Sequence, residues 1–188
     1  MIPTIKKILE FVSRLPVYIS GWIAIFLFNW LIVPGFSKWF GVTLDPKVIP
    51  LDLRFLYDTD HVNELFQTLG AEGRRVYTLF EILADIPYIF VYTLVYMATI
   101  YMLYKKNWHW AILPFLVGAF DLAENFSILY LLHQYPQLDI TPVLFSSIMT
   151  SLKWSFAALT LLWVIVGLIK KIFFKPPENE YEEIQLFP

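Results

Sequence analysis

The sequence contains no cysteine. This absence excludes disulfide bonds, thiolate catalysis and cysteine-based metal sites. Charged residues are also scarce, at 16%, and the net charge of −2 gives no sign of a nucleic-acid partner. The motifs of zinc hydrolases, of serine hydrolases and of phosphate-binding P-loops do not occur. The sequence therefore shows no recognised catalytic motif and predicts no cofactor.

What the chain does have is apolar sequence, because 58% of its 188 residues are hydrophobic and 19% are aromatic. Soluble domains contain about 45–50% apolar residues. Four apolar stretches approach or exceed the roughly 20 residues that cross a bilayer. They are residues 17–33, 76–104, 108–132 and 142–169. The sequence thus predicts an all-α, four-helix transmembrane bundle, with residues 1–175 as one membrane domain.

Two further segments are predicted to lie outside these spans. Residues 35–75 form a long loop in which Val62, Leu65 and Phe66 share one helical face, so we expect a short amphipathic helix there and a structured loop. Residues 176–188 are acidic and flanked by proline, which is typical of a disordered tail.

The distribution of lysine and arginine predicts the orientation. Basic residues precede the first span, lie between the second and third, and follow the fourth, whereas residues 133–140 contain none. Basic residues beside spans favour the cytoplasmic side. We therefore expect a multi-pass protein of a bacterial inner membrane, with both termini in the cytoplasm and the long loop outside.

The most informative residues are polar and ionisable groups inside the predicted spans. An ionisable group in mid-bilayer costs roughly 2.5–3.5 kcal/mol on insertion scales, and such groups are often functional. When each span is followed from its outer end, all of them fall in the outer half of the bilayer. The sequence therefore predicts one polar pocket, open toward the long loop. Its members are Glu81 and Asp85 in the second span, Asp121, Glu124 and Asn125 in the third, and Lys153 in the fourth.

Four carboxyl groups in this pocket share a single amine, so the cluster would be strongly negative if every group were ionised. Three arrangements relieve the repulsion: some carboxyls stay protonated, arginines of the loop fold over the pocket, or a cation binds. We expect Asp52, Arg54 and Arg74 to form such a lid, with Arg75 as a further candidate. Tyr88 follows Asp85 by about one turn and is a further candidate for the pocket. The three histidines lie in or near different loops, so no metal site is predicted.

Four segments together resemble an uncharacterised, mostly bacterial family of small four-span integral membrane proteins. They are Leu51-Asp52-Leu53-Arg54-Phe55, Leu69-Gly70-Ala71-Glu72-Gly73-Arg74, Asp121-Leu122-Ala123-Glu124-Asn125 and Lys153-Trp154. The layout of spans, with Phe80-Glu81 followed by Pro87, is loosely similar to EXPERA-type membrane proteins, which bind amine or sterol-like ligands in an acidic membrane pocket. This chain has Asn29 in its first span, where those proteins carry an acidic residue.

Three functions fit these observations. The first is a pocket that binds a small lipophilic or amphipathic, lipid-like molecule; if the protein is an enzyme, Asp85, Asp121, Glu124 and Lys153 are the candidates for proton transfer. The second is an accessory or assembly subunit that binds a membrane-protein partner. The third is a proton- or ion-coupled transporter, for which four spans would require a homodimer.

Overall fold

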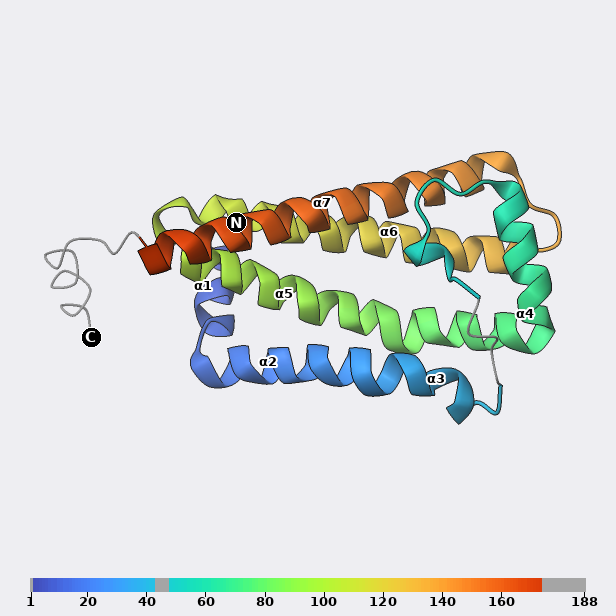
Figure 1. The fold of residues 1–188 in the computed structure, drawn as a ribbon, viewed down its shortest axis with the longest axis horizontal. Helices are drawn as coiled ribbons and strands as arrows, with labels where there is room; N and C mark the ends of the chain where they lie inside the picture. The colour runs from blue at the N-terminus through green and yellow to red at the C-terminus, as the bar shows by residue number, and fades with distance from the viewer. Residues whose placement is uncertain (1, 43–47, 174–188) are drawn as a thin grey trace, which may run out of the picture.

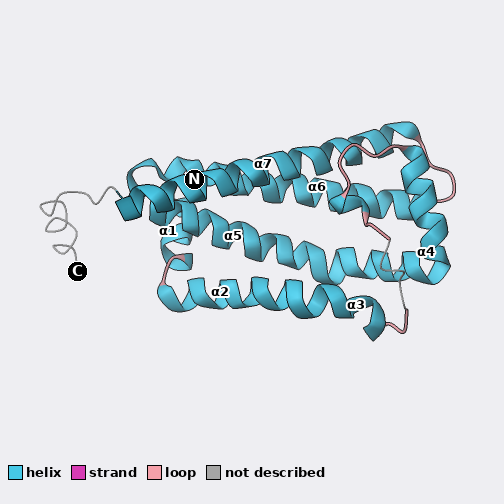
Figure 2. Ribbon diagram, in the orientation of Figure 1, coloured by secondary structure: helices cyan, strands magenta, loops and turns pink. Residues whose placement is uncertain are grey.

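A computed structural model describes residues 2–42 and 48–173, and within these ranges it contains helices and no strand (Figure 2). The predicted tail, residues 176–188, lies outside the described residues. Four helical stretches are long and apolar enough to cross a membrane. They are Leu15–Trp39, Thr59–Leu103, Lys105–Gln134 and Ile140–Phe173. The predicted all-α bundle with four spans is therefore confirmed.

The first span is longer than its sequence pattern indicated. It consists of α2 (Leu15–Leu27), a π-helical turn (Phe28–Ile32) and α3 (Val33–Trp39). We expected the span to end at Pro34, but this proline occupies one of the first positions of α3. Proline is tolerated at the start of a helix because its missing N–H has no intrahelical partner there. The wider turn before it lets the helix continue.

The second span also contains a π-helical turn that is followed by a proline in the next helix. It consists of α4 (Thr59–Phe80), a π-helical turn (Glu81–Asp85) and α5 (Ile86–Leu103), which begins with Pro87 in its first turn. Pro87 therefore follows a π turn and does not break the helix. Such turns are frequent at functional sites, and this one carries two of the predicted pocket residues.

α4 also bends sharply at Gly70. The expected amphipathic helix forms its first half, and Val62, Leu65 and Phe66 are buried. Gly70 has φ 62° and ψ −174°, after which the helix resumes. The first half lies across one end of the bundle and the second half enters it (Figure 1). The long loop is consequently shorter than predicted, because residues 71–75 are helical.

The third and fourth spans form the other side of the bundle. A 3₁₀ segment (Lys105–Ala111) leads into α6 (Ile112–Gln134), and α7 (Ile140–Phe173) returns along it. α7 packs against α6 and α5, and α2 packs against α5 (Figure 1). The two outermost walls of the bundle are therefore α2–α3 on one side and α7 on the other.

A helix that the sequence analysis did not predict begins the chain. α1 (Ile2–Val12) packs on the end of α5, where Leu9 is buried with Ile100 and Ala111. At the opposite end, residues 48–58 form a segment that leads into α4 and that we call the strap. Leu51 and Tyr57 anchor the strap in a core with Phe66. Each end of the bundle is thus covered by a short crossing helix.

We predict that Gly70→Ala lowers the free energy of unfolding by about 1–3 kcal/mol, the cost of holding a residue with a side chain in this sparsely populated backbone region. A Cβ at Gly70 would meet no atom within 4 Å, so the effect isolates the backbone. Thermal unfolding of the purified protein in detergent measures it. Glu72→Ala, at an exposed position of the same helix, should change stability by less than about 0.5 kcal/mol. Equal stability of the two variants would contradict the conclusion that the backbone conformation at Gly70 favours glycine.

Candidate functional site

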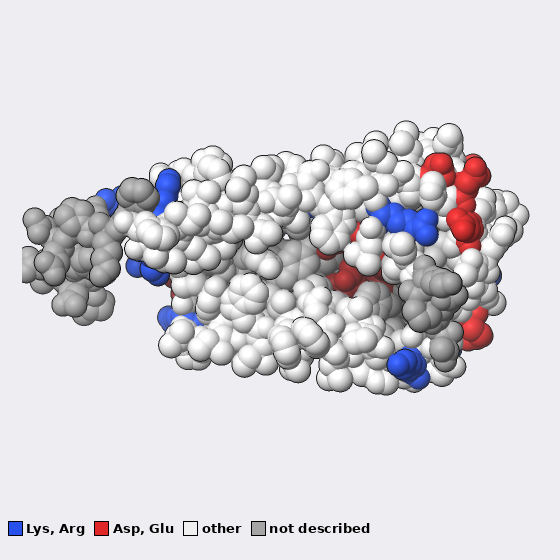
Figure 3. Space-filling view, viewed as in Figure 1, with Lys and Arg blue, Asp and Glu red and all other residues white. Residues whose placement is uncertain are grey.

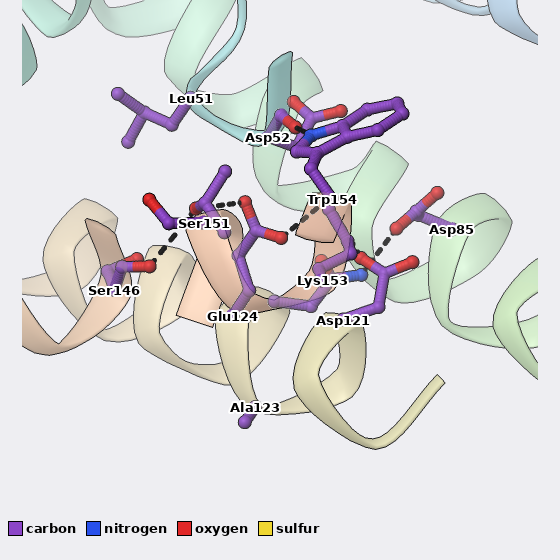
Figure 4. Close-up of polar contacts among 12 residues, drawn as sticks. Leu51, Asp52, Asp85, Asp121, Ala123, Glu124, Ser146, Ser151, Lys153 and Trp154 are labelled. Carbon is purple, nitrogen blue, oxygen red and sulfur yellow. Dashed lines mark hydrogen bonds and ion pairs between the residues drawn. The ribbon is translucent and has the colours of Figure 1, made fainter. Parts of the chain in front are cut away.

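Lys153 lies at the centre of the polar cluster. Its Nζ atom is 3.1 Å from Oδ1 of Asp121 and 2.5 Å from Oε2 of Glu124. The side chains are 9%, 10% and 0% exposed, respectively. Asp121 and Glu124 are three residues apart on α6, and this spacing directs both side chains to the face that meets α7. The structure therefore brings these three predicted residues together as one buried ion triad (Figure 4).

Hydrogen bonds extend the triad toward the strap. Thr150 lies one turn before Lys153 on α7, and its hydroxyl donates to Oε1 of Glu124 at 2.6 Å. The hydroxyl of Tyr57, from the strap, donates to Ser146 at 2.6 Å, and burial raises its pKa to about 12. Tyr57 is therefore a neutral hydrogen-bonding anchor at physiological pH, and it ties the strap to α7.

The other side of the triad faces α5. The hydroxyl of Tyr92 donates to Oδ2 of Asp121 at 2.6 Å. Asn125 Nδ2 donates to Oδ2 of Asp85 at 2.6 Å, which places this carboxylate beside the triad without an ion pair to Lys153. Glu81 is also buried, with 1% exposure. All six predicted residues of spans two to four thus lie in one region of the bundle, although only three share direct ionic contacts.

The first π turn contacts the beginning of α5, just after the second π turn. The ring of Phe28 stacks on that of Tyr88 with centroids 3.7 Å apart, and Asn29 Nδ2 donates to the Tyr88 hydroxyl at 2.8 Å. Tyr88, which we predicted as a pocket residue, thus contacts the first span, and it also lines the cavity described below. Asn29 thus joins the first two spans by an interhelical hydrogen bond.

The strap covers the triad from the side. The indole N–H of Trp154 donates to the backbone carbonyl of Asp52 at 2.7 Å (Figure 4). The backbone N–H of Leu51 donates to the hydroxyl of Tyr77 at 3.2 Å. Burial raises the pKa of the Asp52 carboxyl, while the nearby charge of Lys153 opposes the shift. Among the residues predicted to form the lid, Asp52 in the strap thus lies beside the cluster.

The arginines of the predicted lid point elsewhere. Arg54 Nε donates to the carbonyl of Ile49. Arg74 Nη1 donates to the carbonyl of Phe66 and its guanidinium lies over the ring of Tyr135. These contacts correct the prediction that Arg54 and Arg74 neutralise the cluster. Their guanidinium groups donate hydrogen bonds to backbone carbonyls of the strap and of α4. Arg75 pairs with Glu72 on the protein surface.

A cavity of about 830 Å³ lies beside the triad, between α2–α3 and α7. Asp52, Asp85, Asp121 and Lys153 line its polar part. Most of the remaining lining is aliphatic or aromatic. Figure 3 shows acidic atoms at the floor of a hollow in this face of the molecule. Within the described residues, no three Asp, Glu and His side chains are placed to hold a metal ion. The cavity therefore places carboxylates and an amine, groups that can exchange protons, at one side of an apolar space.

Sequence reasoning left several of these residues in structural roles. A buried threonine and a tryptophan in an apolar span are typical of interhelical hydrogen bonds and interface anchors, yet Thr150 and Trp154 both contact the site. Tyr57 carried no sequence signal, because it lies in an irregular segment. Tyr92 is readable from the sequence as a hydrogen-bonding residue of the pocket, because it follows Asp85 by two helical turns on the stripe that contains Tyr88.

No family model, curated protein or solved structure matches this chain. The two resemblances stated from its sequence therefore stay predictions, and the function is argued from the site.

Proposed function

We propose that the protein binds one small amphipathic molecule in the cavity beside the ion triad. The supporting observation is the lining, in which carboxylates and an amine occupy one part of an otherwise apolar space of about 830 Å³. Ligand sites are typically cavities of about 300–1,000 Å³ with a few convergent polar groups. A polar cluster that served only to hold helices together would need no such space beside it.

The lining also orients the ligand. Its polar part would lie against Asp52 and Asp85, near the strap. Leu161 is eight residues beyond Lys153 on α7, which is about 12 Å along a helix, and it lines the apolar part of the same cavity. The apolar body of the ligand would extend in that direction, toward Val117. A molecule with one polar end and a compact hydrophobic body fits this division.

The ligand would reach the cavity from the bilayer. The walls are α2–α3 and α7, and the neighbouring surface exposes Trp30 at 73%, Val33 at 47% and Leu162 at 51%. These exposed apolar side chains belong in lipid when the four spans are in a membrane. A hydrophobic molecule dissolved in the bilayer can therefore enter between the two walls without crossing water.

Asp85 is the best placed group for proton transfer, if the ligand is a substrate. It lines the cavity, and it accepts a hydrogen bond from Asn125 rather than forming an ion pair with Lys153. Asp121 already forms an ion pair with Lys153 and accepts a hydrogen bond from Tyr92, and Glu124 does not line the cavity. A carboxyl group without an ionic partner can accept or donate a proton within hydrogen-bond reach of a bound molecule.

We predict that Asp85→Asn weakens ligand retention about tenfold or more, since a hydrogen bond to a charged group contributes about 1.5–3 kcal/mol. Native mass spectrometry of the protein purified in mild detergent measures the bound lipid-like species. Glu72→Gln, an exposed acidic position outside the cavity, is the matched control and should retain the ligand. Undiminished retention by Asp85→Asn across the pH range would sink the proposal.

The two alternative functions give different results in the same preparation. An accessory subunit would carry no small molecule and would co-purify with a membrane-protein partner. A coupled transporter would be a dimer in detergent and would show pH-driven flux after reconstitution in liposomes. A monomer that retains a small molecule supports the binding function over both.

A further inference from the structure

We infer that α1 is an interfacial helix and that it forms, with Arg14, a binding surface for anionic phospholipid headgroups. The helix runs across the ends of α2 and α5 in Figure 1, so its axis lies roughly in the plane of a membrane that the bundle crosses. It joins α2 through residues 13 and 14 alone. The start of the first span therefore holds it at the membrane boundary.

The side chains of α1 divide into three sectors. Leu9 and Val12 are 0% and 8% exposed and face the bundle. Ile8 and Phe11, together with Leu15 after the helix, are exposed at 45%, 53% and 69%. An unpartnered apolar sector of this kind is unfavourable in water. It continues the exposed apolar surface of α2, which lies in lipid.

The third sector is basic. Lys7 is exposed, and Lys6 is 54% exposed with Glu10 3.9 Å from its amine. Arg14 is exposed with its guanidinium 5.4 Å from the centre of the Phe11 ring, so a positive charge sits directly beside the apolar sector. Apolar side chains flanked by lysine and arginine are the pattern of helices that lie at the headgroup–acyl boundary and bind anionic lipid.

The surroundings strengthen the positive field. The 3₁₀ segment that starts at Lys105, and the last turns of α7 with Lys170 and Lys171, lie at the same end of the bundle, and these lysines are exposed. Basic side chains gather at this end in Figure 3. A zwitterionic surface gains little from such a field, whereas an anionic headgroup is attracted by it. The surface therefore favours anionic over neutral phospholipid.

The placement of α1 is tested with single cysteines, which label cleanly because the chain has none of its own. Full-length Phe11→Cys and Glu10→Cys carry an environment-sensitive fluorophore in liposomes. We expect quenching of the Phe11 label by spin-labelled acyl chains and quenching of the Glu10 label by aqueous iodide. Equal access of iodide to both labels would overturn the interfacial placement.

The lipid preference is tested on the full chain by native mass spectrometry with phosphatidylglycerol and phosphatidylcholine as probes. Lys6→Gln, Lys7→Gln and Arg14→Gln together should weaken phosphatidylglycerol binding by up to about fivefold per charge removed, with phosphatidylcholine binding unchanged. The control, Lys38→Gln with Arg75→Gln, removes exposed basic residues far from α1. Unchanged phosphatidylglycerol binding in the triple variant, or an equal loss in the control, would overturn the lipid preference.

Discussion

Replacing Lys153 by methionine is expected to lower the free energy of unfolding by about 3–5 kcal/mol, because breaking a buried ion pair leaves its partners uncompensated. Here the partners are Asp121 and Glu124, whose side chains are 10% and 0% exposed. Methionine keeps the length and apolar stem of lysine, so the change removes mainly the charge. The loss is measured as a lower melting temperature in detergent, followed by tryptophan fluorescence.

A second variant shows whether charge is the cause. Lys153→Met combined with Asp121→Asn and Glu124→Gln removes the amine and both carboxylates while keeping their shapes. We expect it to recover most of the lost stability, because neutral buried groups with hydrogen-bond partners carry a smaller penalty than lone charges. Lys170→Met, at an exposed position near the end of the same helix, should melt like the wild type. If Lys153→Met did so too, the triad would not hold α6 to α7.

The ion triad shows which part of the site is readable from sequence. Asp121 and Glu124 share one helical face because of their spacing, and ionisable groups in an apolar span must find partners within the bundle. Their partner must then lie at the same depth of the bilayer in a neighbouring helix. Counting residues from the ends of the spans predicts this depth for Lys153. Local periodicity and bilayer physics are therefore sufficient for this part.

The strap shows which part is not readable. Tyr57 contacts Ser146, 89 residues away in the chain, and Trp154 donates to a carbonyl of residue 52, 102 residues away. Such contacts depend on how an irregular segment packs, and no periodic pattern encodes it. Arg74 was misassigned for the same reason. It lies near the cluster in sequence, but the bend at Gly70 directs it to the carbonyl of Phe66.

The π turns were missed for a different reason. Proline inside an apolar run signals a break or a kink, and we expected the first span to end at Pro34. In the structure each proline follows a widened turn and the helix continues. The sequence marks where the irregularity occurs, but no local pattern shows that the helix continues through it. Within the first π turn, Phe28 stacks on Tyr88 of the second span.

Filling the cavity separates ligand binding from the stability of the triad. Ala157 lines the cavity on α7, one turn beyond Lys153. We expect Ala157→Trp to reduce ligand retention by at least about tenfold, or 1.4 kcal/mol, because the indole would occupy space that the apolar body of the ligand needs. Retention is again measured by native mass spectrometry, and the melting temperature is recorded for the same samples.

The two measurements together decide the outcome. Inserting a large side chain into a packed core costs about 1–3 kcal/mol of stability, but an indole that enters an open cavity gains contacts instead, so the melting temperature of Ala157→Trp should stay close to that of the wild type. Leu159→Trp, on the exposed face of α7 at 47% exposure, should change neither quantity. Retention lost with stability kept would assign the cavity to the ligand. Full retention in Ala157→Trp would mean that the bound molecule lies elsewhere, and the ion triad would then be a structural feature that holds α6 to α7.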